Sequence, residues 1–398
     1  LIKAAKRPLI IAGGGTIYAG ASEELRALAT ATGIPVGDTQ AGKGAINFDH
    51  PSAVGGVGST GCDSGNHIAD KADLIIGVGT RYSDFTTASK TQFKNPDVKF
   101  VNINVTPFDA AKESAEMVVA DAREALAALT EALADYRVEA AYSEEITAEK
   151  EAWLKATERC YHLDHGPLPA QTEVFGALNE LMGEEDVVIN AAGSMPGDLQ
   201  ALWQARSPLQ YHVEYAFSCM GYEVPAAMGV KLARPEAEVV SIVGDGTYQM
   251  LPMELATVVQ ENIKVIYVLL QNYGFCSIGA LSESRGSQRF GTKYRRRGEG
   301  SHLADEQVID GVDIAANARS WGLDVLEVHT IAEFKEAYRQ AEASDRPTMI
   351  HIETDLYGPN PPGSSWWDVP VSGVSELEST QRAYEEYLRD RKPQRHYL

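Results

Sequence analysis

The stretch 239–275, VVSIVGDGTYQMLPMELATVVQENIKVIYVLLQNYGF, predicts a strand, a glycine turn, a helix and a second strand, in that order. Residues 239–243 form a β-branched apolar run, and the triplet GDG at 244–246 ends it. Apolar residues then recur at near-helical spacing as far as Asn262, and residues 264–270 form the next apolar run. Two parallel strands joined by one helix bring their carboxyl ends together, so this stretch predicts a doubly wound sheet with a site at those ends.

Asp245 and Asn272 each come just after one of these strands, and we expect them to be neighbours. A carboxylate and an amide oxygen suit Mg²⁺, which prefers an octahedron of oxygen ligands and commonly keeps substrate phosphates among them. Gly246 would let a phosphate approach the backbone, and the following helix would present free N–H groups to it. Gly274 leaves room for a neighbouring carbonyl to face the metal. The alternative is a turn and a helix cap in an ordinary α/β protein.

These residues resemble the thiamin diphosphate motif, which is GDG followed, after a helix and a strand, by NN. The pair is Gln271-Asn272 in this chain, and in the family it is the second Asn that binds the metal. The resemblance implies thiamin diphosphate and Mg²⁺ as cofactors, with Asp245, Asn272 and Gly274 around the metal. It also implies that the cofactor contacts the other residues of the same segment: Gly244, Gly246, Thr247 and Phe275.

The segment SCMGYEVPAA at 218–227 resembles the one in which, in this family, a large apolar side chain bends the cofactor. Met220 occupies that position, and the carbonyl of Ser218 matches the position that holds the 4′-amino group. The resemblance therefore implies that Met220 and Ser218 take part in catalysis by shaping the cofactor. Gly193 and Ser194 occupy the place of the family's first phosphate-side loop. The alternative for Met220 is that it fills a core before a helix.

Composition bounds the class of protein. A chain of 398 residues with 44% hydrophobic residues suits two or three domains. A formal charge of −21 argues against a nucleic-acid or anionic-membrane partner. Because no apolar run approaches the roughly 20 residues needed to span a bilayer, and no signal peptide precedes the first strand, we expect a cytoplasmic protein. The four cysteines are scattered without a CxxC pair, which is typical of reduced thiols.

Strand-like and helix-like segments alternate along the chain, which predicts an α/β protein with two doubly wound, Rossmann-like parallel sheets. We expect a central domain at 1–135, a linker with a solvated helix at 136–168, a diphosphate-binding domain at 169–356 and a tail at 357–398. The glycine-ended strands at GGGTIYAG and GVGT could indicate a dinucleotide site. We do not adopt that interpretation, because neither segment gives GxGxxG followed by an acidic residue at the right distance.

Several polar groups could also carry function. His162, Asp164 and His165 could form a metal cluster, but their spacing does not fit one helical face and favours a polar loop between domains. His212 and Glu214 could line the site or form a satisfied polar pair. After Phe275 we expect substrate recognition, or else a solvated loop that ends in a basic run at 295–297. Its polar residues are Ser282, Glu283, Ser284, Arg285 and Arg289.

A finer resemblance covers the chain. Its segments are AGGGTIYAGA, DTQAGKGA, GTRYSDFTTASK, LSESRGSQRFGTKYR and SSWWDVPV, the last with Trp366 and Trp367. They are similar to the trihydroxycyclohexane-1,2-dione hydrolases of inositol catabolism. That family opens a cyclic polyhydroxy diketone to 5-deoxyglucuronate by hydrolysis of a C–C bond. The alternatives are another thiamin enzyme of diketones or 2-oxoacids, such as acetolactate synthase, or a catalytically inactive fragment.

The sequence departs from the family at its start. Family enzymes have an N-terminal pyrimidine-binding domain, whose glutamate hydrogen-bonds the aminopyrimidine of the cofactor. The chain begins at Leu1, a few residues before a strand of the central domain, and contains no counterpart of that glutamate. We therefore expect a fragment of a longer polypeptide or half of a split enzyme. Because the family's site forms between subunits, we expect the complete enzyme to be a homodimer or homotetramer.

Overall fold

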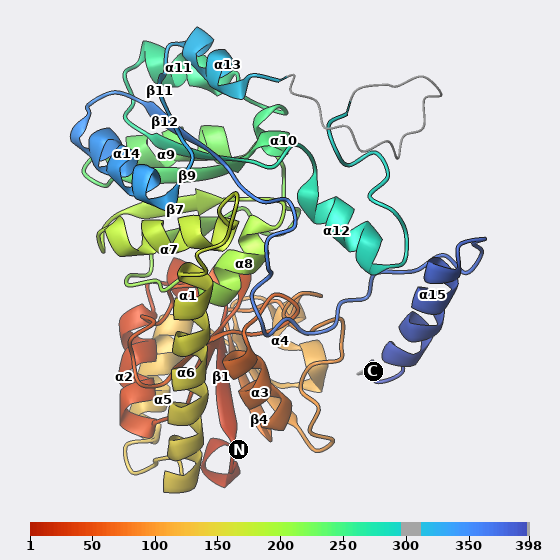
Figure 1. Ribbon diagram of the computed structural model, residues 1–398. Helices are drawn as coiled ribbons and strands as arrows, with labels where there is room; N and C mark the ends of the chain where they lie inside the picture. Colours follow the sequence, from red (N-terminus) through yellow and green to blue (C-terminus); the bar gives the residue numbers. More distant parts are fainter. Residues whose placement is uncertain (296–311, 396–398) are drawn as a thin grey trace.

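The computed structural model describes residues 1–295 and 312–395 and contains two six-stranded sheets. All strand pairs within both sheets are parallel, and helices flank them (Figure 1). The predicted α/β class with two doubly wound sheets is confirmed. The division into domains at 135, 168 and 356 stays a prediction, and Arg296 and Arg297 of the basic run lie outside the described residues. No helix in the described part is long and apolar enough to cross a membrane.

The first sheet has the strand order β3-β2-β1-β4-β5-β6. Strands are therefore added on one side of β1 as far as β3 and on its other side from β4 onward. Strand β1 is buried along its whole length, because helices cover both faces of a parallel sheet. Its register pairs Ile10 with Val36 on one side and with Ile76 on the other. The strands are β1 (Pro8–Ala12), β2 (Val36–Asp38), β3 (Ala53–Gly56), β4 (Leu74–Val78), β5 (Lys99–Asn104) and β6 (Glu116–Val119).

Two helices on this sheet, α2 and α5, pack on each other. Helix α2 ends at Gly33, whose φ of 69° gives the left-handed cap that favours glycine. The helices are η1 (Ile2–Ala4), α1 (Gly14–Tyr18), α2 (Ser22–Thr32), η2 (Gln40–Gly42), α3 (Asp63–Lys71), α4 (Pro107–Ala110), η3 (Lys112–Ser114) and α5 (Ala122–Ala132).

The second sheet has the order β11-β12-β10-β9-β7-β8 and places β9 directly beside β10. This is the pair of strands predicted from the stretch 239–275. Its register pairs Leu270 with Gly244, so both strands end at the same edge. The strands are β7 (Val187–Asn190), β8 (Tyr211–Val213), β9 (Val239–Gly244), β10 (Ile266–Gln271), β11 (Asp324–Val328) and β12 (Thr348–Glu353).

The predicted helix between β9 and β10 is α11, and a short helix on the GDG turn, α10, precedes it. Helix α10 ends at Tyr248 and helix α11 begins at Glu254, with Pro252 between them. Proline lacks the N–H that a continuous helix needs and restricts the residue before it, which accounts for the break. The helices of this half are α7 (Gln171–Leu181), α8 (Met195–Leu202), α9 (Glu223–Ala233), α10 (Asp245–Tyr248), α11 (Glu254–Gln260), α12 (Cys276–Ser284), α13 (Ile314–Trp321) and α14 (Ile331–Ala343).

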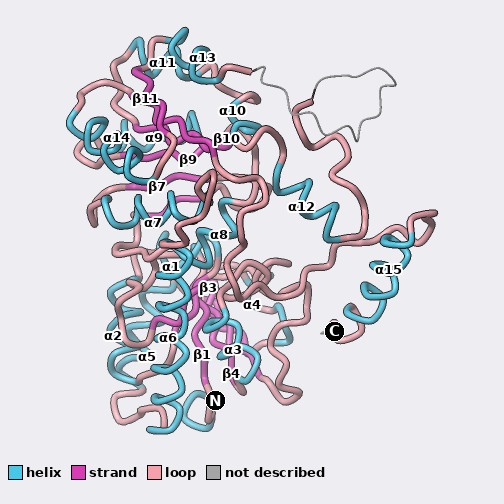
Figure 2. The backbone as a smooth tube through the Cα atoms, viewed as in Figure 1, coloured by secondary structure: helices cyan, strands magenta, loops and turns pink. Residues whose placement is uncertain are grey.

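Helix α6 (Ala140–Tyr161) corrects the prediction of a solvated linking helix. The helix is present, but Tyr142, Ile146, Trp153 and Cys160 are buried on one face, against α3 and β3 of the first half and α7 of the second. Figures 1 and 2 show it running alongside the first sheet. The apolar residues recur at helical spacing among many Glu and Lys residues, and that charged composition obscured the buried face.

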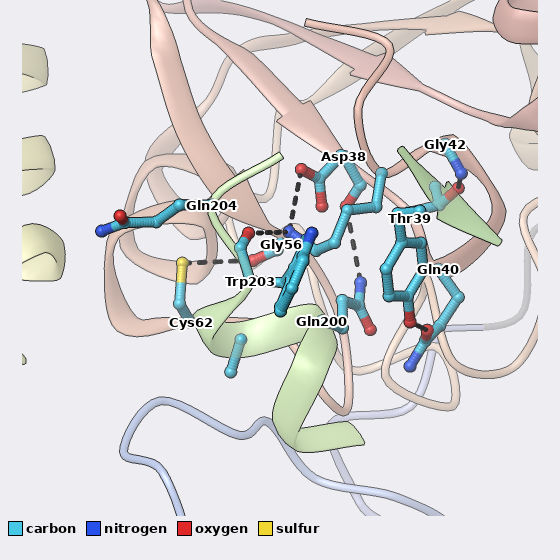
Figure 3. Close-up of polar contacts among 12 residues, drawn as sticks. Asp38, Thr39, Gln40, Gly42, Gly56, Cys62, Gln200, Trp203 and Gln204 are labelled. Carbon is cyan, nitrogen blue, oxygen red and sulfur yellow. Dashed lines mark hydrogen bonds and ion pairs between the residues drawn. The ribbon is translucent and has the colours of Figure 1, made fainter. Parts of the chain in front are cut away.

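The two halves are joined by a buried polar contact (Figure 3). The Asp38 carboxylate, at the end of β2, lies 3.3 Å from the ammonium of Lys43. Lys43 also donates to the backbone carbonyl of Trp203, at the end of α8, at 3.4 Å. The Nε2 of Gln200 donates to the backbone carbonyl of Val57 at 3.3 Å. These contacts fix α8, and with it one wall of the second half, against the first sheet.

The C-terminal segment returns from the second sheet to the first half and ends in α15 (Glu378–Asp390). The Trp367 indole N–H donates to Asp84 at 2.7 Å, and its ring lies 5.0 Å from that of Phe85. The backbone N–H of Asp368 donates to the Ser89 hydroxyl at 2.8 Å. The adjacent indoles noted in the sequence therefore anchor an ordered segment.

Candidate functional site

Asp245 and Asn272 lie together at the carboxyl ends of β9 and β10. The Asp245 carboxylate accepts backbone N–H groups from Asn272 at 3.3 Å, Tyr273 at 2.6 Å and Gly274 at 3.2 Å. It also accepts the N–H of Gly246 at 2.8 Å. The segments that follow β9 and β10 therefore both contact this carboxylate, because the two parallel strands end side by side. The predicted neighbourhood of Asp245 and Asn272 is therefore present.

The electrostatics of the pair suit a cation. Burial raises the pKa of Asp245 to about 6, and its backbone hydrogen bonds partly counter that rise. Among the described residues, no lysine, arginine or histidine forms an ion pair with Asp245. The side-chain Oδ1 of Asn272 is buried and has no hydrogen-bond partner. Because buried polar atoms are seldom left unpaired, this amide oxygen, next to a carboxylate without a protein cation, fits a hard cation such as Mg²⁺.

A cavity of about 580 Å³ opens in front of these oxygens. It is lined by every residue that the sequence assigned to the cofactor. These are Gly193, Ser194, Ser218, Met220, Gly244, Asp245, Gly246, Thr247, Asn272, Gly274 and Phe275. The structure thus brings together the segments that follow four strands of the second sheet, β7, β8, β9 and β10. The contact of each residue with a cofactor stays a prediction.

Glycine is needed at two of these positions. Gly193 has a φ of 90°, in the left-handed region, and no atom lies within 4 Å of where a Cβ would stand. A Cβ on Gly246 would lie 3.0 Å from the ring of Phe275. Both glycines line the cavity, where the turn at Gly193 is open and the turn at Gly246 packs closely on Phe275. An approaching diphosphate requires an open turn such as that at Gly193.

Glu223 is a buried carboxylate that the sequence reasoning missed. Its Oε2 accepts the backbone N–H of Gly221 at 3.1 Å and the hydroxyl of Thr247 at 2.9 Å, while its Oε1 is buried without a partner. Burial raises the pKa of Glu223. It therefore links the Met220 segment to the GDG turn. A charged residue inside the apolar run YEVPAA was the available signal.

Asp198 is a second titratable group that the sequence did not indicate. It lines the cavity from α8, and burial raises the pKa of its carboxyl to about 7. The Nε2 of Gln171 donates to this carboxylate, and the Oε1 of Gln171 accepts the Ser194 hydroxyl at 3.1 Å. The phosphate-side loop is thereby tied to α7 and α8.

The far end of the cavity is formed by α12 and the C-terminal segment. Of the polar residues expected to recognise substrate, only Arg285 lines the cavity, together with Ser364, Ser365, Trp366 and Trp367. Arg289 instead pairs with Glu283 at 2.8 Å and stacks on Tyr357. Residues 364–367 lie some 80 residues beyond Arg285 in the chain, and no local pattern indicated that they would form this end of the cavity.

The histidines have separate partners. His212 Nε2 lies 2.7 Å from the Tyr222 hydroxyl, whereas the carboxylate of Glu214 accepts the backbone N–H of Cys219 at 2.7 Å and lines the cavity. His165 Nε2 lies 2.7 Å from Asp355, and His162 contacts Glu158 instead. No group of three possible metal ligands among His, Cys, Asp and Glu occurs in residues 1–295 and 312–395.

A second cavity, of about 780 Å³, lies at the carboxyl ends of the strands in the first sheet. The glycines 13–15 and Gly79, which raised the question of a dinucleotide, line it together with Tyr18 and Arg234. It shares Gln40, Val213, Glu214 and Tyr215 with the first cavity, so the two adjoin. Each sheet therefore has a cavity at its switch point.

A cavity at a switch point, with a buried oxygen pair and an open glycine turn, defines a cofactor site of the diphosphate type. Residues 1–129 match the "Thiamine pyrophosphate enzyme, central domain", and residues 191–352 match the "Thiamine pyrophosphate enzyme, C-terminal TPP binding domain". The chain belongs to the thiamine pyrophosphate enzymes.

Relatives within the family give a narrower comparison. The chain is 41% identical over 421 residues to 3D-(3,5/4)-trihydroxycyclohexane-1,2-dione hydrolase of Bacillus cereus (strain AH820). It is 40% identical to the hydrolase of the same name from Bacillus anthracis (strain CDC 684 / NRRL 3495), and 41% identical to that from Bacillus thuringiensis (strain Al Hakam). Each match covers 100% of this chain and 65% of the relative's length.

Proposed function

We propose that this chain provides the central and diphosphate-binding parts of a thiamin diphosphate- and Mg²⁺-dependent hydrolase. The proposed substrate is 3D-(3,5/4)-trihydroxycyclohexane-1,2-dione, the compound in the names of its relatives, and the proposed product is the 5-deoxyglucuronate of inositol catabolism. The observation that carries the proposal is the cavity, which gathers all the predicted cofactor residues around the buried oxygens of Asp245 and Asn272.

In this proposal the protein residues act by binding and orienting. Asp245, Asn272 and a backbone carbonyl beside Gly274 hold Mg²⁺, and the turns at Gly193 and Gly246 admit the diphosphate. Met220, whose side chain borders the same cavity, supports the bent form of the cofactor. Thiamin diphosphate, when bound, supplies a nucleophilic carbon for a carbonyl group.

Ser218 has a role of a different kind. Its φ of 50° lies in the left-handed region, which is uncommon for a residue with a side chain. Such conformations persist where the surrounding structure imposes them, and they are frequent at functional sites. The proposal assigns the Ser218 carbonyl as the acceptor of the cofactor's 4′-amino group, so this turn would keep that proton donor in place.

The overall reaction balances without an oxidant. The bond between the two carbonyl carbons of the dione breaks, and one of these carbons receives the oxygen of water and becomes a carboxylate. The other keeps the electron pair, takes up a proton and becomes an aldehyde. Water is therefore the only second substrate, which is consistent with a hydrolase.

The complete protein includes more than the matched part. The relatives extend beyond the match by about a third of their length, and we propose that this part supplies the pyrimidine-binding domain and its glutamate. We further propose a dimer or tetramer, because sites of this family form between subunits. A positioned acid–base group contributes about 10²–10⁴ in rate. The 398 residues alone should therefore open the dione at least about 100-fold more slowly than the complete protein.

The test measures ring opening of trihydroxycyclohexane-1,2-dione by the complete protein and by the 398-residue chain, each with thiamin diphosphate and Mg²⁺. Adding the separately expressed remainder to the chain should restore activity. Condensation of two 2-oxoacid molecules serves as the competing assay. Condensation without ring opening would overturn the proposed substrate, and equal rates for the chain and the complete protein would show that a base inside these residues suffices.

A further inference from the structure

The end of the cofactor cavity away from Asp245 carries two hydrogen-bond donors that no protein group uses among the described residues. We propose that Arg285 and Trp366 form the substrate-binding end of this cavity, and that the Arg285 guanidinium binds the carboxylate generated by ring opening. This inference rests on the proposed function. It adds the residues that select an acceptor-rich substrate and hold its acidic product.

Arg285 follows α12 and faces the cavity. Its Nε is buried without a hydrogen-bond partner, and its Nη2 makes a long contact of 3.4 Å with the backbone carbonyl of Trp367. Among the described residues no carboxylate forms an ion pair with it. Arg289, four residues further along the chain, forms an ion pair with Glu283. Arg285 is therefore a cation at a cavity wall, and the described part of the chain supplies no compensating anion.

Trp366, in the C-terminal segment, lines the same cavity. Its indole Nε1 is buried and has no partner, while its ring stacks on Tyr387 with centroids 6.3 Å apart. The backbone carbonyl of Trp366 accepts the Ser59 hydroxyl at 3.2 Å, which anchors the residue on the first half. The neighbouring indole of Trp367 is already engaged by Asp84. Of these two indoles, Trp366 is the one whose N–H has no partner in the described part of the chain.

Two unpaired donors on residues that line one cavity indicate the chemistry of its occupant. A buried N–H without a partner costs free energy, so these groups favour a ligand that brings oxygen acceptors. The dione brings ketone and hydroxyl oxygens, and hydrolysis converts one ketone carbon into a carboxylate. A guanidinium fork matches a carboxylate with two parallel hydrogen bonds. Arg285 is thus suited to the group that exists only after the C–C bond has broken.

The walls are held in position by contacts outside the cavity. The Ser365 hydroxyl contacts the Gln92 amide oxygen at 2.9 Å. Directly after Arg285, the carbonyl of Gly286 accepts hydrogen bonds from the hydroxyls of Ser379 at 2.6 Å and Thr380 at 2.9 Å. Arg285 and Trp366 therefore sit on one connected surface, in which the C-terminal segment joins α12 to the first half (Figure 1). A preorganised pair of donors loses little freedom on binding.

The experiment uses the complete protein loaded with thiamin diphosphate and Mg²⁺, and D-glucuronate as a carboxylate probe. Calorimetry measures the affinity for D-glucuronate, and steady-state kinetics measures KM and kcat for the dione. Arg285→Gln should weaken D-glucuronate binding by about 10- to 100-fold, the range for losing a hydrogen bond to a charged group. Arg285→Lys should recover part of it, and Trp366→Phe should raise KM for the dione more than it lowers kcat.

Arg289→Gln is the matched control and should leave the affinity for D-glucuronate and both kinetic constants within about twofold. The affinity for thiamin diphosphate, measured in parallel, should stay unchanged in all four variants. Unchanged D-glucuronate affinity in Arg285→Gln would overturn the inference, and so would an equal loss in Arg289→Gln. A matching loss of cofactor affinity in Arg285→Gln would also overturn it, because Arg285 would then belong to the diphosphate.

The two proposals fail separately. A protein that opens the dione normally with Gln at position 285, and binds D-glucuronate as before, contradicts the inference alone. A protein that opens no dione but binds D-glucuronate through Arg285 contradicts the proposed reaction and supports the carboxylate site.

Discussion

Asp38 in the first half and Asp245 in the second are both aspartates at the carboxyl end of a buried parallel strand, yet their surroundings differ. Burial raises the pKa of both carboxyls. Asp38 has the Lys43 ammonium at 3.3 Å, whereas Asp245 is surrounded by backbone N–H groups and an open cavity. A carboxylate supplied with a protein cation holds the structure together, and one left without a cation can bind a metal.

The comparison shows that the fold alone does not decide which strand end becomes a site. Both sheets have the same parallel, doubly wound arrangement and a cavity at the switch point. The difference lies in the few residues after each strand: Lys43 follows Asp38 closely in the chain, while Asn272 reaches Asp245 from the next strand. Function is therefore carried by residues placed on a shared scaffold.

The largest expected effect comes from replacing Asp38, the aspartate that forms the buried ion pair. Asp38→Asn should lower the free energy of unfolding by about 3–5 kcal/mol, because it leaves the buried Lys43 ammonium without a partner. Urea denaturation at pH 7 measures it. The double variant Asp38→Asn with Lys43→Met should recover much of the loss, since it removes the uncompensated charge. A single variant as stable as the parent would show that this buried ion pair does not stabilise the fold.

The second prediction removes the other aspartate. Asp245→Ala in the complete protein should weaken Mg²⁺-dependent thiamin diphosphate binding by at least about 100-fold, because groups that merely support a metal ligand already cost about 10–100-fold. Calorimetry with and without Mg²⁺ checks it. Asp109→Ala, in the cavity of the first sheet, is the control and should leave cofactor affinity unchanged. Equal affinity in Asp245→Ala would rule out the proposed metal site.

The third prediction concerns the shape of the cavity rather than its charge. Met220→Ala should lower kcat by about 10-fold, because a small misplacement of reacting groups slows a reaction strongly, while cofactor affinity changes little. Rates of dione opening and cofactor titration separate the two effects. Met117→Ala, on the partly exposed strand β6 of the first sheet, is the control. Full turnover by Met220→Ala would remove this residue from the mechanism.

The last prediction concerns the pH dependence of the stability of the folded protein. The folded pKa of Asp198, about 7, lies above the usual value, so the folded protein binds the proton more tightly than the unfolded chain. Its contribution to stability is fully present below the unfolded pKa of about 3.9 and is lost as the pH rises through about 7. Asp198→Asn should therefore gain stability relative to the parent between pH 5 and pH 8, by about 2–3 kcal/mol at about 1.4 kcal/mol for each pKa unit.

Melting temperatures between pH 5 and 8 check this prediction, with the two proteins expected to converge at the acid end. Asp109→Asn is the control and should show no such divergence, because its carboxylate pairs with Lys112 at 2.7 Å. If Asp198→Asn and the parent differ by the same amount at every pH, Asp198 does not titrate in this range.

Much of the fold was predictable because local sequence and tertiary contacts agree. The apolar runs at 239–243 and 264–270 became β9 and β10, and the parallel pairing of these strands placed Asn272 beside Asp245. The helix predicted between them is α11, and Pro252 separates it from the short helix α10 on the GDG turn, which the sequence did not indicate. The charged composition of α6 hid its buried face, since a one-sided apolar stripe changes average composition little.

The sequence by itself placed the GDG turn beside Asn272, through local spacing and the rule that parallel strands end at one edge, and the resemblance to the family added the Met220 segment. Tertiary structure alone decided which buried groups remain without partners. Lys43 neutralises Asp38, Glu223 joins two loops, and the C-terminal segment carries Trp366 to the cavity that Arg285 also lines. Pairing between residues far apart in the chain depends on packing in three dimensions, and no local pattern specifies it.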